Sequence, residues 1–284
     1  MEQMHTTEFD AVLQQQLTHL NNYPEMLPFI GSKWNESNIK TLIIAESHYA
    51  DTACFTEAHF NNWYETSSKD FKLKDNYYTD YINTRNVINI AENTNKFGFK
   101  KPLLIFYNII NEVKKHIPKM QNQQHIFPYF SFYNYFQRPA SIQSASIINA
   151  LTLKDREVAY QTIKSLTQTI LPRRIIFASR LSYNTFIQSK QNEKGNLLFE
   201  NINIENIPHP GSAWWNKRSA NYGKDETQNR YRTGKEKFIH LIKSWVLENI
   251  MIPQLKKYRN IKFIFIELQK QLLFEIGKHF IWLK

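Results

Sequence analysis

Two short segments of the chain place acid–base side chains directly after apolar runs. Leu42-Ile-Ile-Ala-Glu46-Ser-His-Tyr49 passes from an apolar stretch into a carboxylate, a hydroxyl and an imidazole, and Ile207-Pro-His209-Pro-Gly-Ser212 brings a second imidazole. An open α/β sheet presents its functional groups at the carboxyl ends of its strands. We therefore expect Glu46 and His209 to share one cleft and to act there as an acid–base pair.

A third segment, residues 128–139, surrounds Asn134 with aromatic side chains. A buried amide is costly unless it is hydrogen-bonded. Its donor and acceptor head suits the edge of a pyrimidine, and Phe132 or Tyr133 could stack on a base. The alternatives are a structural hydrogen bond at the end of a strand for Asn134 and core packing for the two rings.

The order and spacing of these segments resemble the uracil-DNA glycosylase superfamily. Ala45-Glu46-Ser47-His48-Tyr49 is similar to the water-activating motif of that superfamily, which reads Gly-Gln-Asp-Pro-Tyr-His in one branch and Gly-Glu-Ala-Pro-Gly in another. His209-Pro210-Gly211-Ser212 resembles its His-Pro-Ser loop, and residues 128–139 resemble the strand that lines its base pocket. The resemblance covers roughly residues 28 to 248. It implies a monofunctional DNA glycosylase that flips a non-standard base, hydrolyses its N-glycosidic bond and leaves an abasic site.

The resemblance also implies roles for individual residues. Glu46 would position or deprotonate the attacking water and stabilise the cationic sugar, and His209 would donate a hydrogen bond to the leaving base. Ser47 stands where the most active uracil enzymes have Asp, and Tyr49 aligns with the Tyr that excludes the methyl group of thymine. The expected base-binding residues are Ser47, Tyr49, Phe132, Tyr133 and Asn134. The base itself stays open between uracil and a bulky modified pyrimidine, such as a glycosylated cytosine of phage DNA attacked in antiviral defence.

The loop after His209 is expected to contact DNA. Base flipping opens a gap in the stack at a cost of a few kcal/mol, and the superfamily inserts an apolar side chain at this place. The expected DNA-binding residues are Ser212, Trp214, Trp215, Lys217 and Arg218. A basic strip continues with Lys224, Arg230, Arg232, Lys235 and Lys237. Packing of the two Trp onto the sheet, and an ordinary solvated face for the charges, are the alternatives.

Composition favours a polyanionic partner. The 36 Lys and Arg against 25 Asp and Glu give a net charge of +11, and 20 Phe, 15 Tyr and 6 Trp are available to stack on bases. Cys54 is the only cysteine, which excludes an intramolecular disulfide and a Cys-rich metal or iron–sulfur site. We expect neither a metal nor another cofactor. The first ten residues lack signal-peptide character, and charges interrupt the apolar stretch 261–284, so we expect a cytoplasmic protein without a membrane span.

Periodicity predicts the elements that position these residues. Helices are expected at 9–20, 81–91, 103–116, 153–170, 181–188 and 233–250, and strands at 40–45, 127–133, 173–179 and 201–207. Thr152 and Asp155 have the spacing of a capping box, and the stretch 46–95 is expected to be irregular apart from its short helix. This pattern predicts a three-layer α/β/α fold with a central, mainly parallel four-stranded sheet. Residues 1–250 would form the glycosylase-like domain, and 251–284 a C-terminal extension of unknown role.

Two other functions compete with the glycosylase. The first is a catalytically weak or inactive DNA-binding module that recognises flipped or single-stranded bases. The second is an esterase-like hydrolase that uses Ser47 and His48. Adjacent Ser and His side chains cannot readily face each other, and the sequence has no Gly-x-Ser-x-Gly elbow, which argues against the esterase.

Overall fold

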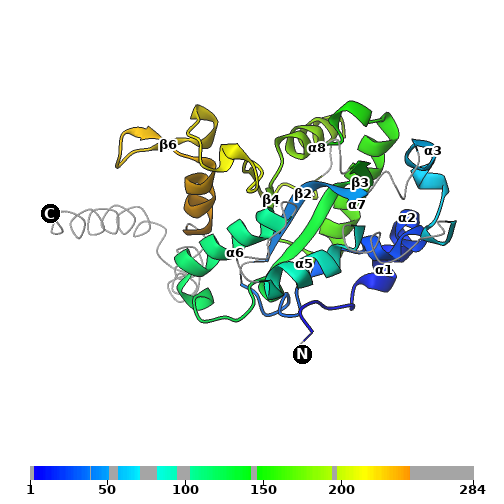
Figure 1. Ribbon diagram of the computed structural model, residues 1–284, viewed down its shortest axis with the longest axis horizontal. Coiled ribbons are helices and arrows are strands. Elements are labelled where there is room, and N and C mark those ends of the chain that lie inside the picture. The colour runs from blue at the N-terminus through cyan, green and yellow to red at the C-terminus, as the bar shows by residue number, and fades with distance from the viewer. Residues whose placement is uncertain are drawn as a thin grey trace. The chain divides into compact units, whose positions relative to one another are not determined.

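The computed structural model describes residues 3–38, 40–50, 57–70, 82–94, 103–141, 146–193 and 197–243. Within them the chain forms a mainly parallel five-stranded sheet with helices around it (Figure 1). Its strands are β1 (Phe29–Ile30), β2 (Thr41–Ala50), β3 (Ser131–Ser141), β4 (Arg174–Phe177) and β5 (Asn203–Asn206). The expected extension 251–284 lies outside the described residues.

The sheet has the order β1-β3-β2-β4-β5. Strands β3, β2, β4 and β5 are parallel to one another, and β1 pairs antiparallel with β3. The prediction of four strands was therefore one short. The edge strand β1 has only two residues, and such a short run carries no period that a sequence pattern could reveal.

Most helices match the expected segments, but a second short helix, at Glu57–Asn61, lies in the stretch 46–95, for which only one helix was expected. They are α1 (Asp10–Gln16), α2 (Thr18–Asn22), α3 (Glu57–Asn61), α5 (Thr84–Asn93), α6 (Leu104–His116), α7 (Leu153–Ile170), α8 (Arg180–Asn192) and a helix at 234–243, beyond which the chain is not described. The single helix expected at 9–20 is in fact two, because Leu17 takes an extended conformation between α1 and α2. A small hairpin, β6 (Lys224–Asp225) and β7 (Arg230–Tyr231), was not foreseen.

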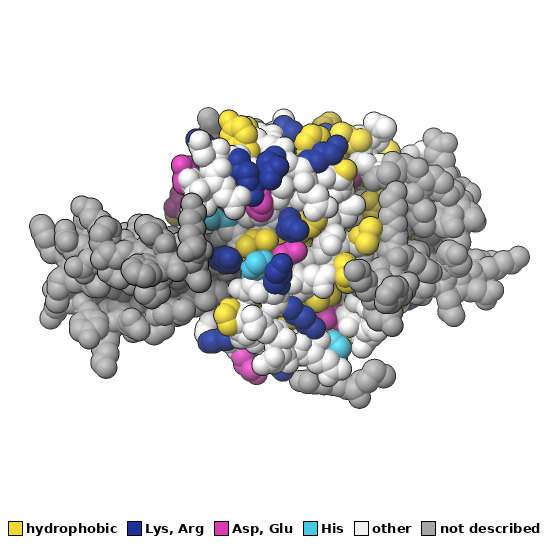
Figure 2. Space-filling view, turned by 60° about the vertical axis from the view of Figure 1, so that its left-hand side comes forward, with side chains coloured by type: hydrophobic (Ala, Val, Ile, Leu, Met, Phe, Trp, Pro, Cys, Tyr) yellow, Lys and Arg dark blue, Asp and Glu magenta, His cyan; other side chains and the backbone are white. Residues whose placement is uncertain are grey.

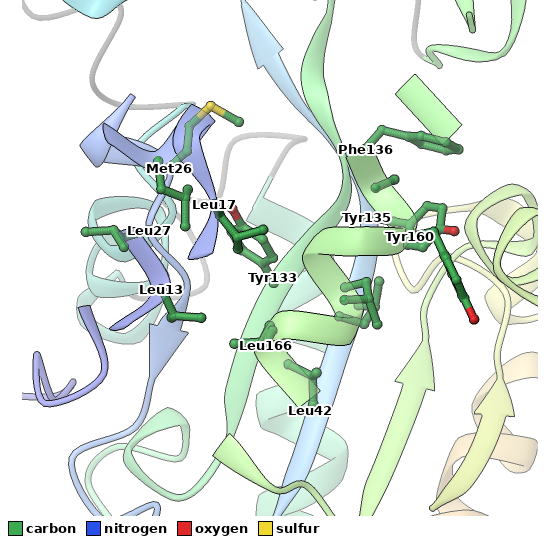
Figure 3. Close-up of a cluster of buried hydrophobic side chains, with 14 of the residues drawn as sticks. Leu13, Leu17, Met26, Leu27, Leu42, Tyr133, Tyr135, Phe136, Tyr160 and Leu166 are labelled. Atoms are coloured by element: carbon green, nitrogen blue, oxygen red, sulfur yellow. The ribbon is translucent and has the colours of Figure 1, made fainter. Parts of the chain in front are cut away.

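Side chains that alternate along β3 face two different layers. Phe132 contacts Phe106 of α6, with ring centroids 4.8 Å apart. Its neighbour Tyr133 belongs to a buried cluster with Leu13 of α1 and Leu166 of α7 (Figure 3). Helices α5 and α6 cover one face of the sheet and α7 lies behind it (Figure 1). Helices on both faces explain why β2 and β4 are almost continuously apolar up to residue 45 and residue 177.

Strand β2 does not end at Ala45, as the sequence analysis expected, but runs through the polar residues to Ala50. Its second half still pairs with β3, with Ser47 opposite Phe136 and Tyr49 opposite Ala140. Two steps along β2 thus match four along β3, which is a bulge in β3. Pro139 lies in this bulge, where a residue without an N–H group is tolerated.

Strand β3 was also misplaced in the sequence analysis. It begins at Ser131 and not at Phe127, and it extends eight residues beyond the expected end at Tyr133. The segment Phe127–Tyr129 forms a 3₁₀ turn, for which Pro128 has the required backbone angle.

A buried ion pair holds the start of α7 against β3. The capping box is confirmed: Asp155 N donates to Thr152 Oγ1 over 3.1 Å, and Thr152 N donates to Asp155 Oδ2 over 2.8 Å. Arg138 Nε and Nη2 donate to the same carboxylate over 2.9 and 2.6 Å, and the Tyr64 hydroxyl donates to it over 2.9 Å. Burial alone would raise the pKa of Asp155, but the hydrogen bonds from Arg138 and Thr152 hold it below its ordinary value. The carboxylate is therefore ionised and fully engaged at neutral pH.

We predict that Asp155→Ala lowers the free energy of unfolding by about 3–5 kcal/mol, because it leaves the Arg138 guanidinium buried without its counter-ion. Lys154→Ala is the matched control on the same helix. Its ion pair with Glu157 is exposed on both sides, so its loss should cost less than about 1 kcal/mol. Urea unfolding of the two variants measures both values. Losses of similar size would contradict the assignment of a stabilising role to the Asp155 network.

Candidate active site

Two cavities meet at the carboxyl edge of the sheet. One is a small pocket of about 60 Å³ and the other a cleft of about 830 Å³. Glu46 and His209 line both of them. The structure therefore brings together the two residues that the sequence predicts as an acid–base pair.

The pocket is built by the second half of β2, by β3 and by helices on one face of the sheet. Four of the five expected base-binding residues line it, namely Ser47, Tyr49, Phe132 and Asn134. Its other lining residues are Ala45, His48, Thr84, Val87, Ile105 and Phe106. Ala45 lies opposite Asn134 in the sheet, and its short side chain leaves space there.

Tyr133 is the expected base-binding residue that does not reach the pocket. Neighbouring residues of a strand point to opposite faces, and Tyr133 points into the core, where its hydroxyl donates to Gln137 Oε1 over 2.6 Å. Only Phe132 of the two aromatic candidates is thus placed to contact a ligand in the pocket.

Three donors hold the carboxylate of Glu46. Ser146 Oγ donates to Oε1 over 2.6 Å, Ile147 N donates to Oε1 over 3.4 Å, and Ser179 Oγ donates to Oε2 over 3.0 Å. A carboxylate offers about four acceptor positions. Within the described residues these three donors leave one position on Oε2 for a further donor, such as a water molecule.

His209 is held in one tautomer by its own turn. Gly211 N donates to His209 Nδ1 over 3.1 Å, so the proton of the neutral ring lies on Nε2. Burial lowers the pKa of His209, and the nearby Glu46 carboxylate only partly opposes this effect. His209 is therefore a neutral hydrogen-bond donor at neutral pH.

Two hydroxyl groups at the pocket have unmet hydrogen-bonding capacity. Ser47 Oγ and Thr84 Oγ1 are buried, and neither has a hydrogen-bond partner among the described residues. A buried hydroxyl without a partner is unfavourable unless a ligand or water satisfies it. Thr84 is the first residue of α5. No motif surrounds it, so the sequence analysis could not predict that it lines the pocket.

Only one of the two adjacent tryptophans of the loop lines the cleft. Trp214 lines the cleft with 54% of its surface exposed, and Lys217 Nζ lies 5.4 Å from the centre of its ring. Trp215 is only 3% exposed and packs against Phe238, so it cannot contact DNA as expected. Ser212 lines the cleft, together with residues that the sequence analysis missed, among them Arg180, Asn184, Asn206, Ser219, Asn221 and Tyr222.

The basic strip is only partly available to a ligand. Arg230 forms an ion pair with Glu236, with 2.7 Å between Nη2 and Oε1. Lys237 forms a longer one with Glu205, with 3.8 Å between Nζ and Oε2. Lys217 and Arg218 are exposed. Lys and Arg side chains lie around hydrophobic and histidine side chains on one face of the protein (Figure 2).

No protein-family model matches the sequence, and no curated protein is significantly similar to it. Within the described residues no His, Cys, Asp or Glu cluster could hold a metal ion. None of the helices in this part of the chain is both long and apolar enough to cross a bilayer.

We predict that Ser47→Ala and Thr84→Val leave the melting temperature unchanged or raise it, because each removes a buried hydroxyl that has no partner in the described part of the chain. Thr84→Val keeps the shape of the side chain. Scanning calorimetry measures the effect, and Thr152→Val is the control. Since Thr152 Oγ1 accepts the capping hydrogen bond, its loss should cost about 1 kcal/mol. Destabilisation by all three substitutions would show that the pocket hydroxyls are structural.

Proposed function

We propose that the protein is a DNA glycosylase, with a fold and site of the uracil-DNA glycosylase type, that hydrolyses the N-glycosidic bond of a flipped pyrimidine nucleotide. The observation that carries the proposal is the position of Glu46 and His209 where a small pocket, mainly apolar with a few polar groups, meets a large cleft. The pocket is suited to a base, and the cleft is suited to the sugar and phosphates. The mainly parallel sheet is compatible with the α/β/α fold that the resemblance implies.

The two residues would act at opposite ends of the bond that breaks. A water molecule on Glu46 Oε2 attacks C1′ of the sugar, and its proton passes to the carboxylate. The C1′–N bond breaks, and its electron pair leaves with the base. The Nε2–H group of His209 donates to a carbonyl oxygen of the base and stabilises the charge that develops there. The Glu46 carboxylate stabilises the cationic sugar before it takes up the proton. The base leaves as an anion and takes a proton from solvent, and Glu46 returns its proton to solvent. The products are the free base and an abasic site.

The lining of the pocket supports a polar, planar ligand. Phe132 offers a ring face, Asn134 an amide, and Ser47 and Thr84 two hydroxyls without partners in the described residues. A volume of 60 Å³ is smaller than the roughly 150 Å³ of a cavity that binds benzene, so side chains must move when a base enters. The adjoining cleft has room for a bulky substituent. Uracil and a modified pyrimidine both remain candidate substrates.

The cleft supports DNA as the polymer that carries this base. Arg180 and the Trp214–Lys217 pair supply positive charge and an exposed aromatic face. These are the groups that contact phosphates and unstacked bases. The net charge of +11 favours the same partner.

We predict that Glu46→Gln and His209→Asn each lower single-turnover base excision by a factor of about 10² or more. Asn at position 209 keeps an acceptor for Gly211 N and removes the Nε2–H donor. The assay uses oligonucleotides with uracil, hypoxanthine or hypermodified cytosines, followed by alkaline cleavage. Glu157→Gln, the same change at an exposed helix position, is the control and should keep full activity.

Full activity of Glu46→Gln would refute the catalytic role of that residue. Tight binding of DNA without release of any base by the wild-type protein would favour the DNA-binding module over the enzyme.

We also predict that the two tryptophans respond differently to substitution. Trp214→Ala should weaken excision from duplex DNA far more than from single strands, because only the duplex must be unstacked. Trp215→Ala should lower the free energy of unfolding by about 3–5 kcal/mol because it empties a buried site. Equal losses on duplex and single-stranded substrate for Trp214→Ala would show that Trp214 does not open the duplex.

A further inference from the structure

The turn that carries His209 is held by a side chain that lines neither cavity. Asn108 of α6 donates from Nδ2 to the carbonyl oxygen of Pro210 over 2.7 Å, across 102 positions of sequence. We propose that Asn108 is a positioning residue that keeps His209 in the tautomer and orientation required to donate from Nε2. This inference rests on the proposed function, in which that donor stabilises the leaving base.

One peptide group links the two side chains. The carbonyl oxygen of Pro210 accepts from Asn108, and the N–H group at the other end of the same peptide, Gly211 N, donates to His209 Nδ1 over 3.1 Å. Both directions are unambiguous, because a carbonyl oxygen can only accept and a backbone N–H group can only donate. The amide of Asn108 and the ring of His209 are therefore assigned independently of each other. Since the peptide is planar, its rotation would break both hydrogen bonds together.

This peptide is also the part of the turn that can rotate. Ser212 N donates to the carbonyl oxygen of His209 over 2.8 Å, so residues 209–212 form a β-turn with the Pro210–Gly211 peptide at its centre. Type I and type II turns differ in the orientation of this central peptide, and type II requires a positive φ at the third residue. That residue is Gly211, whose φ is not positive here but which can take either sign at little cost. The turn therefore has an accessible alternative, in which Gly211 N points away from the His209 ring.

The backbone on both sides of this peptide is held by other contacts. Ser212 Oγ donates to the carbonyl oxygen of His209 over 2.7 Å, in addition to the bond from Ser212 N. Pro208 packs against the start of the helix at 234–243, where a Cβ added to Gly234 would lie only 2.1 Å from Pro208 Cγ. These contacts fix the ends of the turn, and the bond from Asn108 selects the orientation of the peptide at its centre.

Helix α6 supports the turn without bringing Asn108 to the base. A Cβ added to Gly211 would lie 3.4 Å from Leu104 Cβ, so the turn rests on α6 four residues before Asn108, on the same face of the helix. Ile105 and Phe106 line the pocket, whereas Asn108 lines neither the pocket nor the cleft. Asn108 thus acts on the base only through the turn and His209.

The test measures the tautomer of His209 and base excision separately. Asn108→Leu keeps a side chain of similar size and removes the donor, and Asn108→Ala is a second variant without it, in case Asn108→Leu does not fold. Asn111→Leu is the matched control, because Asn111 is exposed on the same helix. ¹⁵N NMR of the histidine rings shows which nitrogen carries the proton, and the spectrum of His209→Asn identifies the signals of His209 by their loss. Single-turnover excision is measured for each variant and for Asn108→Leu combined with His209→Asn.

We expect neutral His209 to carry its proton on Nε2 in the wild-type protein and in Asn111→Leu, and a mixture of both tautomers in Asn108→Leu. The excision rate constant should fall at least about tenfold in Asn108→Leu, with the affinity for DNA within about threefold of wild type. In the His209→Asn background the same substitution should lower the rate constant by less than about twofold, because the group through which it acts is gone.

Melting temperatures check that each variant is folded. An unchanged tautomer in folded Asn108→Leu or Asn108→Ala overturns the inference, and so does an equal loss of rate in the His209→Asn background. Both results leave the proposed function intact. Failure of the wild-type protein to release any base refutes the proposed function, whereas the NMR spectra still decide whether Asn108 fixes the tautomer of His209.

Discussion

The carboxylate of Glu46 can stay at the edge of a buried sheet only because two other parts of the fold donate hydrogen bonds to it. A charged oxygen that is removed from water needs such partners. Ser179 serves two elements at once, since its Oγ accepts from Ser182 N at the start of α8 and donates to Glu46 Oε2. Ser146 and Ile147 approach from the segment that precedes α7. The orientation of this one side chain therefore depends on β2, α8 and the approach to α7 together.

The position of the Glu46 side chain also depends on the buried ion pair of Arg138 and Asp155. Arg138 Nη2 also donates to the carbonyl oxygen of Ala150, which lies in the segment that carries Ser146. The bulge in β3 next to Pro139 places Arg138 where it reaches both acceptors. A network that stabilises the start of α7 thus also positions the donors of Glu46. Stability and site geometry are linked here by the same side chains.

The sequence predicted the parts of the fold that local chemistry determines. The apolar run before Glu46, the Thr152–Asp155 capping box and the long helix α7 lie where the patterns place them. The continuation of β2 beyond Ala45 was missed because its polar residues are stabilised by pairing with β3, which is remote in sequence. The length of β3 and the position of its bulge depend on the same long-range pairing. The sequence patterns report only on neighbouring residues, whereas the lengths of these two strands depend on pairing between segments that are far apart in the sequence.

Within the site, pairs of adjacent residues mark the limit of motif reasoning. A motif cannot tell which member of a pair points into a pocket, and the structure separates Phe132 from Tyr133 and Trp214 from Trp215. Thr84 has no motif around it and joins the pocket only because α5 packs beside α6. His48 lies within a motif, but its contact with Asn134 spans 86 positions of sequence. Only the packing of distant segments in the three-dimensional structure shows that these residues belong to the pocket.

The central claim is that Glu46 and His209 direct water onto C1′ of a flipped nucleotide. The most direct measurement is mass spectrometry of the products after the wild-type protein has acted on base-modified oligonucleotides in H₂¹⁸O. The account predicts a free, intact base and an abasic sugar that carries one ¹⁸O atom at C1′. Release of no base from any substrate would contradict the account. So would base release through a protein–DNA adduct that borohydride traps, because that outcome requires an amine nucleophile in place of water.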